Sequence, residues 1–191
     1  MQISPRFKAS DWKSLDLSQE SGWERATEIF EDRINGRFLK MVELIKDVDF
    51  SGFAALALDC LLIETLQQLI EGVDETPRGK GKEYFQRFLS AAPFDGKFDL
   101  ASAGMFYEQF RCGILHQAEI KGSSKVWKVG TMVQLTANGK GLIVNHKALH
   151  TKMRVAFTSY LSALRQGNDQ TLRKNFKKKM DFICQVQPTL P

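Results

Sequence analysis

Cysteine is scarce in this sequence, which has three in 191 residues: Cys60, Cys112 and Cys184. Their number is odd and their spacing wide, so they form neither the close pairs of a zinc site nor an even disulfide framework. His146 and His150 stand four residues apart, which suits a metal, but the sequence offers no identifiable third and fourth ligand. We therefore expect reduced thiols, no metal and no cofactor.

Long apolar runs are also missing. No uninterrupted run approaches the roughly 18 residues of a membrane-spanning helix, and the amino end lacks the apolar core of a signal peptide. The sequence shows no internal repeat and no low-complexity segment. A cytoplasmic protein without a membrane segment is expected, and the 43% hydrophobic content indicates a globular core.

Helical periodicity dominates the sequence and predicts a mainly α fold. Residues 1–20 have no sustained period and read as an amino-terminal arm, whereas residues 21–191 should form a single helical domain. A β-hairpin is expected at about 125–145, around the turn residues Asn138 and Gly139, as an insertion before the last two helices. The expected helices cover residues 21–46, 53–71, 83–91, 100–119, 145–165 and 169–186, and a short tail follows from residue 187.

Charge is divided unevenly along the chain. Residues 1–120 carry 14 Lys and Arg against 20 Asp and Glu, whereas residues 121–191 carry 13 against 2. Such asymmetry indicates either a polyanion partner or subunits that meet basic face to acidic face.

The expected last helix carries several of these cations on one face. A solvated helix face would show the same pattern, but only Asp169 and Asp181 offset the cations here. Contact with RNA phosphates is therefore as consistent with the sequence as solvation is. The candidate substrate-binding residues are Arg173, Lys174, Lys177 and Lys178, together with Gln117 earlier in the chain.

Arg111 and His116 stand five residues apart within the helix expected at 100–119. Five steps of about 100° place them about 140° apart on an ideal helix, so their side chains do not converge by direction alone. The long arginine side chain, a bend at Gly113, or a second subunit supplying the facing pair could bring them together, and the last route needs no distortion. In many proteins, however, such an arginine covers apolar surface and a lone helical histidine is structural.

Two carboxylates, Asp59 and Glu64, interrupt the otherwise apolar helix expected at 53–71. An unpaired buried carboxylate is costly, so each should be paired or lie at an interface. A structural salt bridge is one interpretation, and orientation of Arg111 or His116 is the other.

The segment 106–119, FYEQFRCGILHQAE, resembles the corresponding helix of the HEPN superfamily of small helical bundles. The mark of that family is an arginine followed four to six residues later by a histidine, as in Arg111 and His116. The resemblance covers roughly residues 23–119 and implies a HEPN-like bundle that forms a homodimer, with catalytic Arg111 and His116 at the dimer seam. In some family members an acidic residue of the helix expected at 53–71 orients the pair, which here would be Glu64 or Asp59, and Glu64 is the candidate catalytic carboxylate. It also implies a ribonuclease of toxin or defence type, often held by an inhibitory antitoxin. Many catalytic members carry a polar residue, often Asn, where this chain has Cys112.

Metal-independent RNA cleavage would suit this pair. RNA contains its own nucleophile, the 2′-hydroxyl, so an enzyme needs only to move protons and to stabilise charge on phosphorus. His116 would serve as base or acid, and the planar fork of Arg111 would hold phosphoryl oxygens. The products would be a 2′,3′-cyclic phosphate and a 5′-hydroxyl.

Two other functions stay open at this point. The protein could be a non-catalytic HEPN-like module in which Arg111 and His116 bind a nucleotide or RNA phosphate or stabilise a protein contact. A DNA-binding regulator is less well supported, because no short helix-turn-helix with a polar recognition helix is visible.

Overall fold

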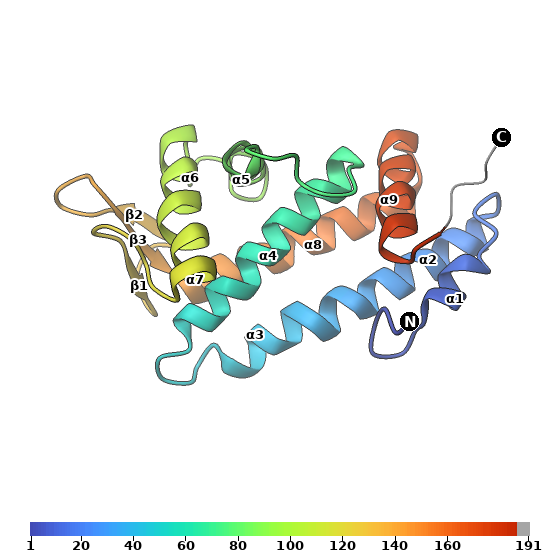
Figure 1. Ribbon diagram of the computed structural model, residues 1–191, viewed down its shortest axis with the longest axis horizontal. Helices are drawn as coiled ribbons and strands as arrows, with labels where there is room; N and C mark the ends of the chain where they lie inside the picture. The colour runs from blue at the N-terminus through green and yellow to red at the C-terminus, as the bar shows by residue number, and fades with distance from the viewer. Residues whose placement is uncertain (187–191) are drawn as a thin grey trace. The chain divides into compact units, whose positions relative to one another are not determined.

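The computed structural model describes residues 1–186, and the predicted tail from residue 187 lies outside the described residues. The chain is 61% helix and 6% strand, which confirms the predicted mainly α class with a small β insertion before the last two helices. Figure 1 shows the elements in chain order. They are α1 (Ala9–Lys13), α2 (Glu20–Ile34), η1 (Asn35–Leu39), α3 (Lys40–Ile45), α4 (Gly52–Glu71), α5 (Gly81–Leu89), α6 (Leu100–Phe106), η2 (Tyr107–Arg111), α7 (Cys112–Gln117), β1 (Lys125–Trp127), β2 (Val133–Leu135), β3 (Leu142–Asn145), α8 (His146–Gln166) and α9 (Gln170–Ile183), where η marks a π-helical segment.

The chain divides into two compact units. The first comprises Met1–Lys40, Gln68–Glu75 and the chain from Thr158 onward, and the second comprises Met41–Gln67 and Thr76–Phe157. α4 is the one described helix that is long and apolar enough to span a membrane by length and composition. Half of the most apolar 18-residue stretch of α4 is buried, as in the core helices of globular proteins.

The first twenty residues are packed into the first unit, although their lack of a period led us to expect a loose arm. Ile3, Phe7 and Trp12 are buried, and the Trp12 indole N–H donates a 2.8 Å hydrogen bond to Asp181 on α9. Trp12 also meets Phe176 edge to face. Only three separate buried side chains hold this segment in place, so its sequence shows no continuous apolar period that would predict its packing.

The helix expected at 21–46 is present as α2, η1 and α3 in one run, with a π-helical segment in its middle. Gly36 lies in that segment. A Cβ added there would sit 2.3 Å from the Pro5 ring, so the glycine permits the amino-terminal chain to approach the helix closely.

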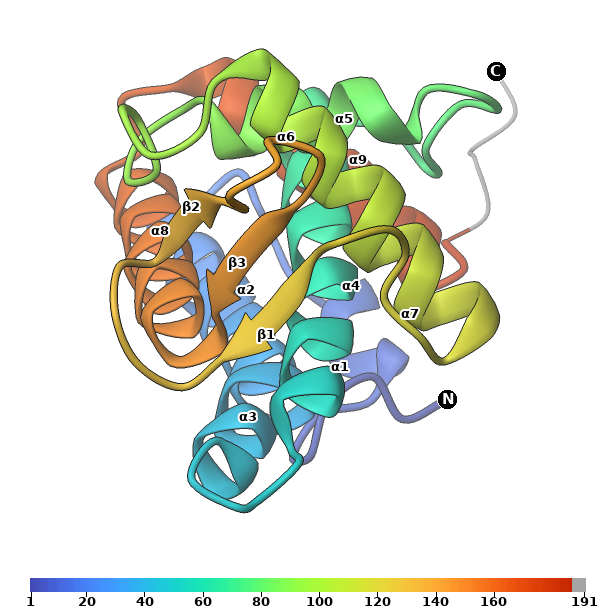
Figure 2. The ribbon, with the colours of Figure 1, turned by 90° about the vertical axis from the view of Figure 1, so that its left-hand side faces the viewer.

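The sheet of the second unit contains the predicted hairpin and one strand more. β2 pairs antiparallel with β3 around the turn at Asn138 and Gly139, where Gly139 has φ +67°. β1 pairs parallel with β3, giving the order β1-β3-β2 seen in Figure 2. The buried residues Leu142 and Val144 of β3 face the core. Because β1 has only three residues, its alternation is too short to predict parallel pairing from sequence.

Candidate functional site

Arg111 joins a carboxylate and a histidine in one hydrogen-bonded row. Its Nη1 lies 3.0 Å from His116 Nε2, and its Nη2 donates to Glu64 Oε2 at 3.0 Å. Both contacts form within a single chain, in the second unit. The arginine side chain is therefore long enough to bridge the angle between the two helix positions, and convergence needs no second subunit.

Burial differs along this row. The Arg111 and Glu64 side chains are 20% and 18% exposed, whereas His116 is exposed at the end of α7. An arginine held by a partly buried carboxylate is fixed more firmly than a surface ion pair. The row thus has an anchored end at Glu64 and an open end at His116.

The electrostatics keep Arg111 charged. Burial lowers the pKa of its guanidinium, but the charge and hydrogen bond of Glu64 outweigh that effect and raise the pKa above its ordinary value. The guanidinium also lies over the Tyr107 ring, 5.7 Å from its centroid. Burial and a hydrogen bond with Cys112 raise the pKa of the Tyr107 hydroxyl, so this residue stays neutral.

Local helix geometry contributes to the site. Arg111 closes the π-helical segment η2, in which the Cys112 N–H bonds to the Tyr107 carbonyl five residues back. Single π turns of this kind are frequent at functional sites. Gly113 lies in the α-helical segment α7, after the π-helical segment that ends at Arg111. A Cβ there would sit 2.4 Å from the Glu119 carbonyl oxygen, so the glycine accommodates the chain that leaves the helix.

The two carboxylates of α4 have separate partners. Glu64 pairs with Arg111, whereas Asp59 is 1% exposed and bonds to His150 Nδ1 at 2.9 Å. His150 is equally buried, and its Nε2 lies 3.5 Å from Glu43. Asp59 is therefore part of a buried pair with His150, whereas Glu64 is the carboxylate that contacts Arg111.

Within residues 1–186, no group of three or more His, Cys, Asp or Glu side chains could hold a metal ion. His146 and His150 share one helix, but they have different surroundings, and His150 is already engaged by Asp59.

The candidate substrate-binding residues separate into two kinds. Gln117, Lys174, Lys177 and Lys178 are exposed. Lys177 forms a salt bridge with Asp181. Arg173 is instead 4% exposed and holds both Glu20 carboxylate oxygens at 2.7 Å, so its guanidinium is not presented for a phosphate. The helix pattern missed this because Arg173 is drawn inward by Glu20, more than 150 residues away in sequence.

The residue that sequence reasoning undervalued is Tyr107. Its helical spacing with Phe106, Phe110 and Ile114 predicts an apolar, core-facing side chain, yet the Arg111 guanidinium lies over its ring. The signal was the spacing of four residues between the two, which places side chains on one helix face.

No protein family model, no curated protein and no solved structure matches this chain.

Proposed function

We propose that this protein is a HEPN-type, metal-independent endoribonuclease that acts as a cytoplasmic homodimer. The observation that carries the proposal is the row formed by Glu64, Arg111 and His116, which combines a fixed cation with an exposed histidine. A fixed cation can stabilise a phosphoryl group, and an exposed imidazole can move a proton. No third group is needed to generate the nucleophile, because RNA supplies it.

The hydrogen bonds of this row support the following proposed mechanism. In the free protein, Arg111 donates to His116 Nε2, so this nitrogen is the acceptor of that hydrogen bond. When a phosphoryl oxygen takes the arginine N–H, Nε2 becomes free to remove the 2′-hydroxyl proton. The 2′-oxygen then forms its bond to phosphorus as the bond to the 5′-oxygen breaks. A protonated imidazole, from this chain or from a second copy, returns a proton to the leaving 5′-oxygen.

A second copy is supported by the surface of α4. Leu61 is 42% exposed, and Ala57 and Leu58 near it are partly exposed. This apolar strip continues along the same helix to Glu64. An exposed apolar helix face beside a polar site is typical of an interaction surface. A homodimer formed there would bring two motif pairs close together, and the same face could meet an inhibitory antitoxin.

A non-catalytic nucleotide-binding, RNA-binding or protein-interaction module is the second candidate. Two observations favour it: Arg111 is already paired with a carboxylate, and Cys112 follows it where many catalytic relatives of the implied family carry a polar residue. In this reading the row binds a phosphate or stabilises a protein contact without moving a proton.

The deciding experiment incubates the purified protein with total and structured RNA in excess EDTA and maps the product ends. Wild type should leave 2′,3′-cyclic phosphate and 5′-hydroxyl ends, and both Arg111→Ala and His116→Ala should abolish cleavage. Arg154→Ala, which removes an exposed arginine from α8, is the matched control and should cleave normally. If a folded dimer freed of any inhibitor cleaves nothing, while His116→Ala weakens RNA binding or dimerisation, the module is the correct function.

A further inference from the structure

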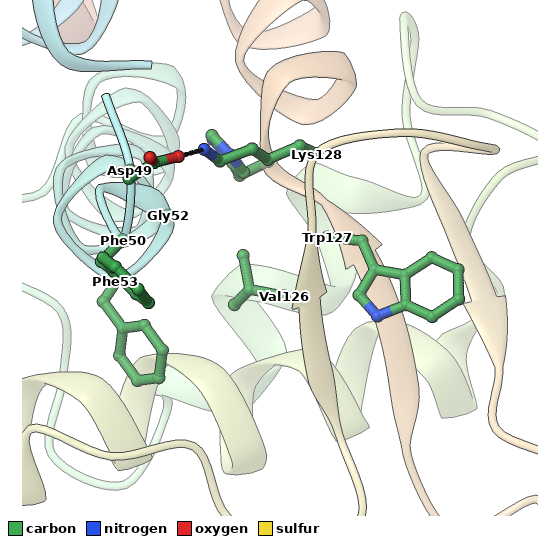
Figure 3. A pocket seen from close by; sticks show the side chains of 8 residues that line it. Asp49, Phe50, Gly52, Phe53, Val126, Trp127 and Lys128 are labelled. Carbon is green, nitrogen blue, oxygen red and sulfur yellow. Dashed lines mark hydrogen bonds and ion pairs between the residues drawn. The ribbon is translucent and has the colours of Figure 1, made fainter. Parts of the chain in front are cut away.

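A cavity of about 420 Å³ opens in the second unit between the start of α4 and strand β1. Figure 3 shows Phe50 and Phe53 together on one side of it, with Val126 of β1 facing them. Trp127 projects from the other side of the same strand. The cavity therefore has two aromatic rings and a branched aliphatic side chain facing one another, a shape that suits a flat ligand.

The aromatic side of this cavity is open to solvent. Phe50 is 97% exposed and adopts φ +61°, and Phe53 is 37% exposed. A fully exposed phenylalanine in a left-handed backbone conformation gains nothing from burial and is sterically disfavoured. The exposure and backbone strain of Phe50 at the mouth of the cavity are explained if its ring contacts a ligand bound there.

His146 supplies the polar feature of the cavity. Its side chain lines the space and is fully buried, yet within residues 1–186 neither ring nitrogen has a hydrogen-bond partner. A buried polar atom without a partner costs about 1–3 kcal/mol. Gly52 also lines the space, and a Cβ there would lie 2.6 Å from Val126 and 3.3 Å from His146 Cδ2. The glycine thus allows the imidazole edge to remain beside the cavity.

The charge state of the lining favours a neutral ligand. Burial, followed by the charges of Lys147 and Lys128, lowers the pKa of His146, so the imidazole is neutral at pH 7. A neutral imidazole offers one N–H donor and one acceptor nitrogen. At the mouth, Lys128 and Asp49 form a 2.6 Å ion pair and cancel each other's charge, as Figure 3 shows.

We propose that this cavity binds a nucleobase, with its ring against Phe50 and Phe53 and its polar edge at His146. Nucleobases are flat, neutral and carry donors and acceptors on one edge, which the two aromatic rings and the unpaired imidazole match. The volume lies within the roughly 300–1,000 Å³ of small-molecule sites. The base can arrive as a free nucleoside or within a single RNA strand. This site goes beyond the proposed ribonuclease activity and does not depend on cleavage.

The test measures equilibrium binding on the His116→Ala background, so that cleavage cannot interfere. One arm uses each of the four ribonucleosides in equilibrium dialysis, and the other uses fluorescein-labelled homopolymeric hexaribonucleotides in anisotropy titrations. We expect saturable binding in at least one arm. Phe50→Ala should weaken it about 5- to 150-fold, the range expected for losing one contact between a base and an aromatic ring.

A second variant keeps the proposal testable if binding depends on more than one ring. His146→Leu removes an unpaired buried polar group, so it should raise the melting temperature while it abolishes binding. Leu100→Ala, which truncates an apolar side chain that is 63% exposed on α6, is the matched control and should bind normally. Binding of nucleosides as well as hexamers would assign free bases to the site, and binding of hexamers alone would assign RNA. No saturable binding in either arm, or affinity unchanged in both variants, would overturn the proposal.

Discussion

Arg111 Nη1 lies 3.0 Å from His116 Nε2, although an ideal helix separates their positions by about 140°. Glu64 bonds to the other terminal nitrogen of the same guanidinium and so fixes its plane. The Arg111 side chain therefore extends across its helix to His116 while its other terminal nitrogen is held by Glu64. If the pair cleaves RNA as proposed, this arrangement predicts that Glu64 positions Arg111.

Glu64→Gln should lower the single-turnover rate of RNA cleavage about 10- to 100-fold, because a neutral amide holds the guanidinium less firmly and small displacements are costly in catalysis. RNA binding and the melting temperature should change little. The measurement is a saturating single-turnover time course, which separates the rate from the affinity. Glu83→Gln, which removes the charge of a partly exposed glutamate on α5, is the control. An unchanged rate in Glu64→Gln would show that Glu64 does not position Arg111.

Arg173 and the exposed lysines of α9 should respond differently to substitution. Arg173→Met should reduce the free energy of unfolding by about 1–3 kcal/mol, because the guanidinium loses its bonds to Glu20 and to the Leu164 carbonyl. Combined Lys174→Ala and Lys178→Ala should leave stability within about 0.5 kcal/mol of wild type. Urea unfolding of both variants checks this contrast, and equal losses would contradict it.

The same lysines can be tested for phosphate contact. If they bind RNA, the slope of the logarithm of the binding constant against the logarithm of the salt concentration should be less steep in the Lys174→Ala and Lys178→Ala double variant. The expected change is about 0.7 for each lost phosphate contact. Arg173→Met should leave the slope unchanged, since its guanidinium is buried. RNA titrations at several salt concentrations measure the slope. An unaltered slope in the double variant would assign these lysines to a solvated face or to another protein surface.

The sequence allowed the helices to be predicted because their apolar residues repeat with the helical period over many turns. It also identified the hairpin turn at Asn138 and Gly139, since few residue pairs favour that geometry. The packed amino-terminal segment and the parallel pairing of β1 were not predictable in this way. Both depend on contacts with distant parts of the chain, such as that of Trp12 with Asp181.

In the candidate site, too, some features could be predicted from the sequence and others depend on contacts between distant residues. Periodicity placed Arg111 and His116 on one helix, and burial cost identified Asp59 and Glu64 as carboxylates that need partners. Periodicity could not decide which carboxylate meets Arg111, because that depends on which face of α4 meets each neighbouring helix. It also could not identify His146 as unpaired, since the partners of a buried side chain depend on the three-dimensional arrangement around it.

The cysteines should differ strongly in reactivity towards iodoacetamide. Only the thiolate reacts, and burial raises the pKa of Cys184 to about 11, so roughly one molecule in a thousand is ionised there at pH 8. Burial also raises the pKa of Cys60 well above its usual range. Cys112 is partly exposed and should be modified first. Mass spectrometry of the native protein over time measures the order, with Cys112→Ser as the control that loses the fast phase. Rapid modification of Cys184 at pH 8 would contradict its burial.

The buried Asp59, which is paired with His150, should make the free energy of unfolding fall as the pH rises. A carboxyl whose pKa is lowered by folding has the opposite effect. Burial raises the pKa of Asp59 above its ordinary value of 3.8, more than the opposing hydrogen bond and charge of His150 lower it. A carboxyl with a raised pKa in the folded state binds its proton more tightly there than in the unfolded chain. Its stabilising contribution is therefore complete below about pH 3.8 and is lost as the pH rises through the folded-state pKa.

Asp59→Asn isolates this contribution, because asparagine keeps the shape and an acceptor oxygen for His150 without the titration. The free energy of unfolding of wild type relative to Asp59→Asn should fall as the pH is raised from about 4. Urea unfolding of both proteins at a series of pH values gives this difference directly. Asp95→Asn, at an exposed position in a loop, controls for the removal of a carboxylate and should show no such trend. A difference that rises with pH would mean that His150 stabilises the Asp59 carboxylate by more than its burial costs.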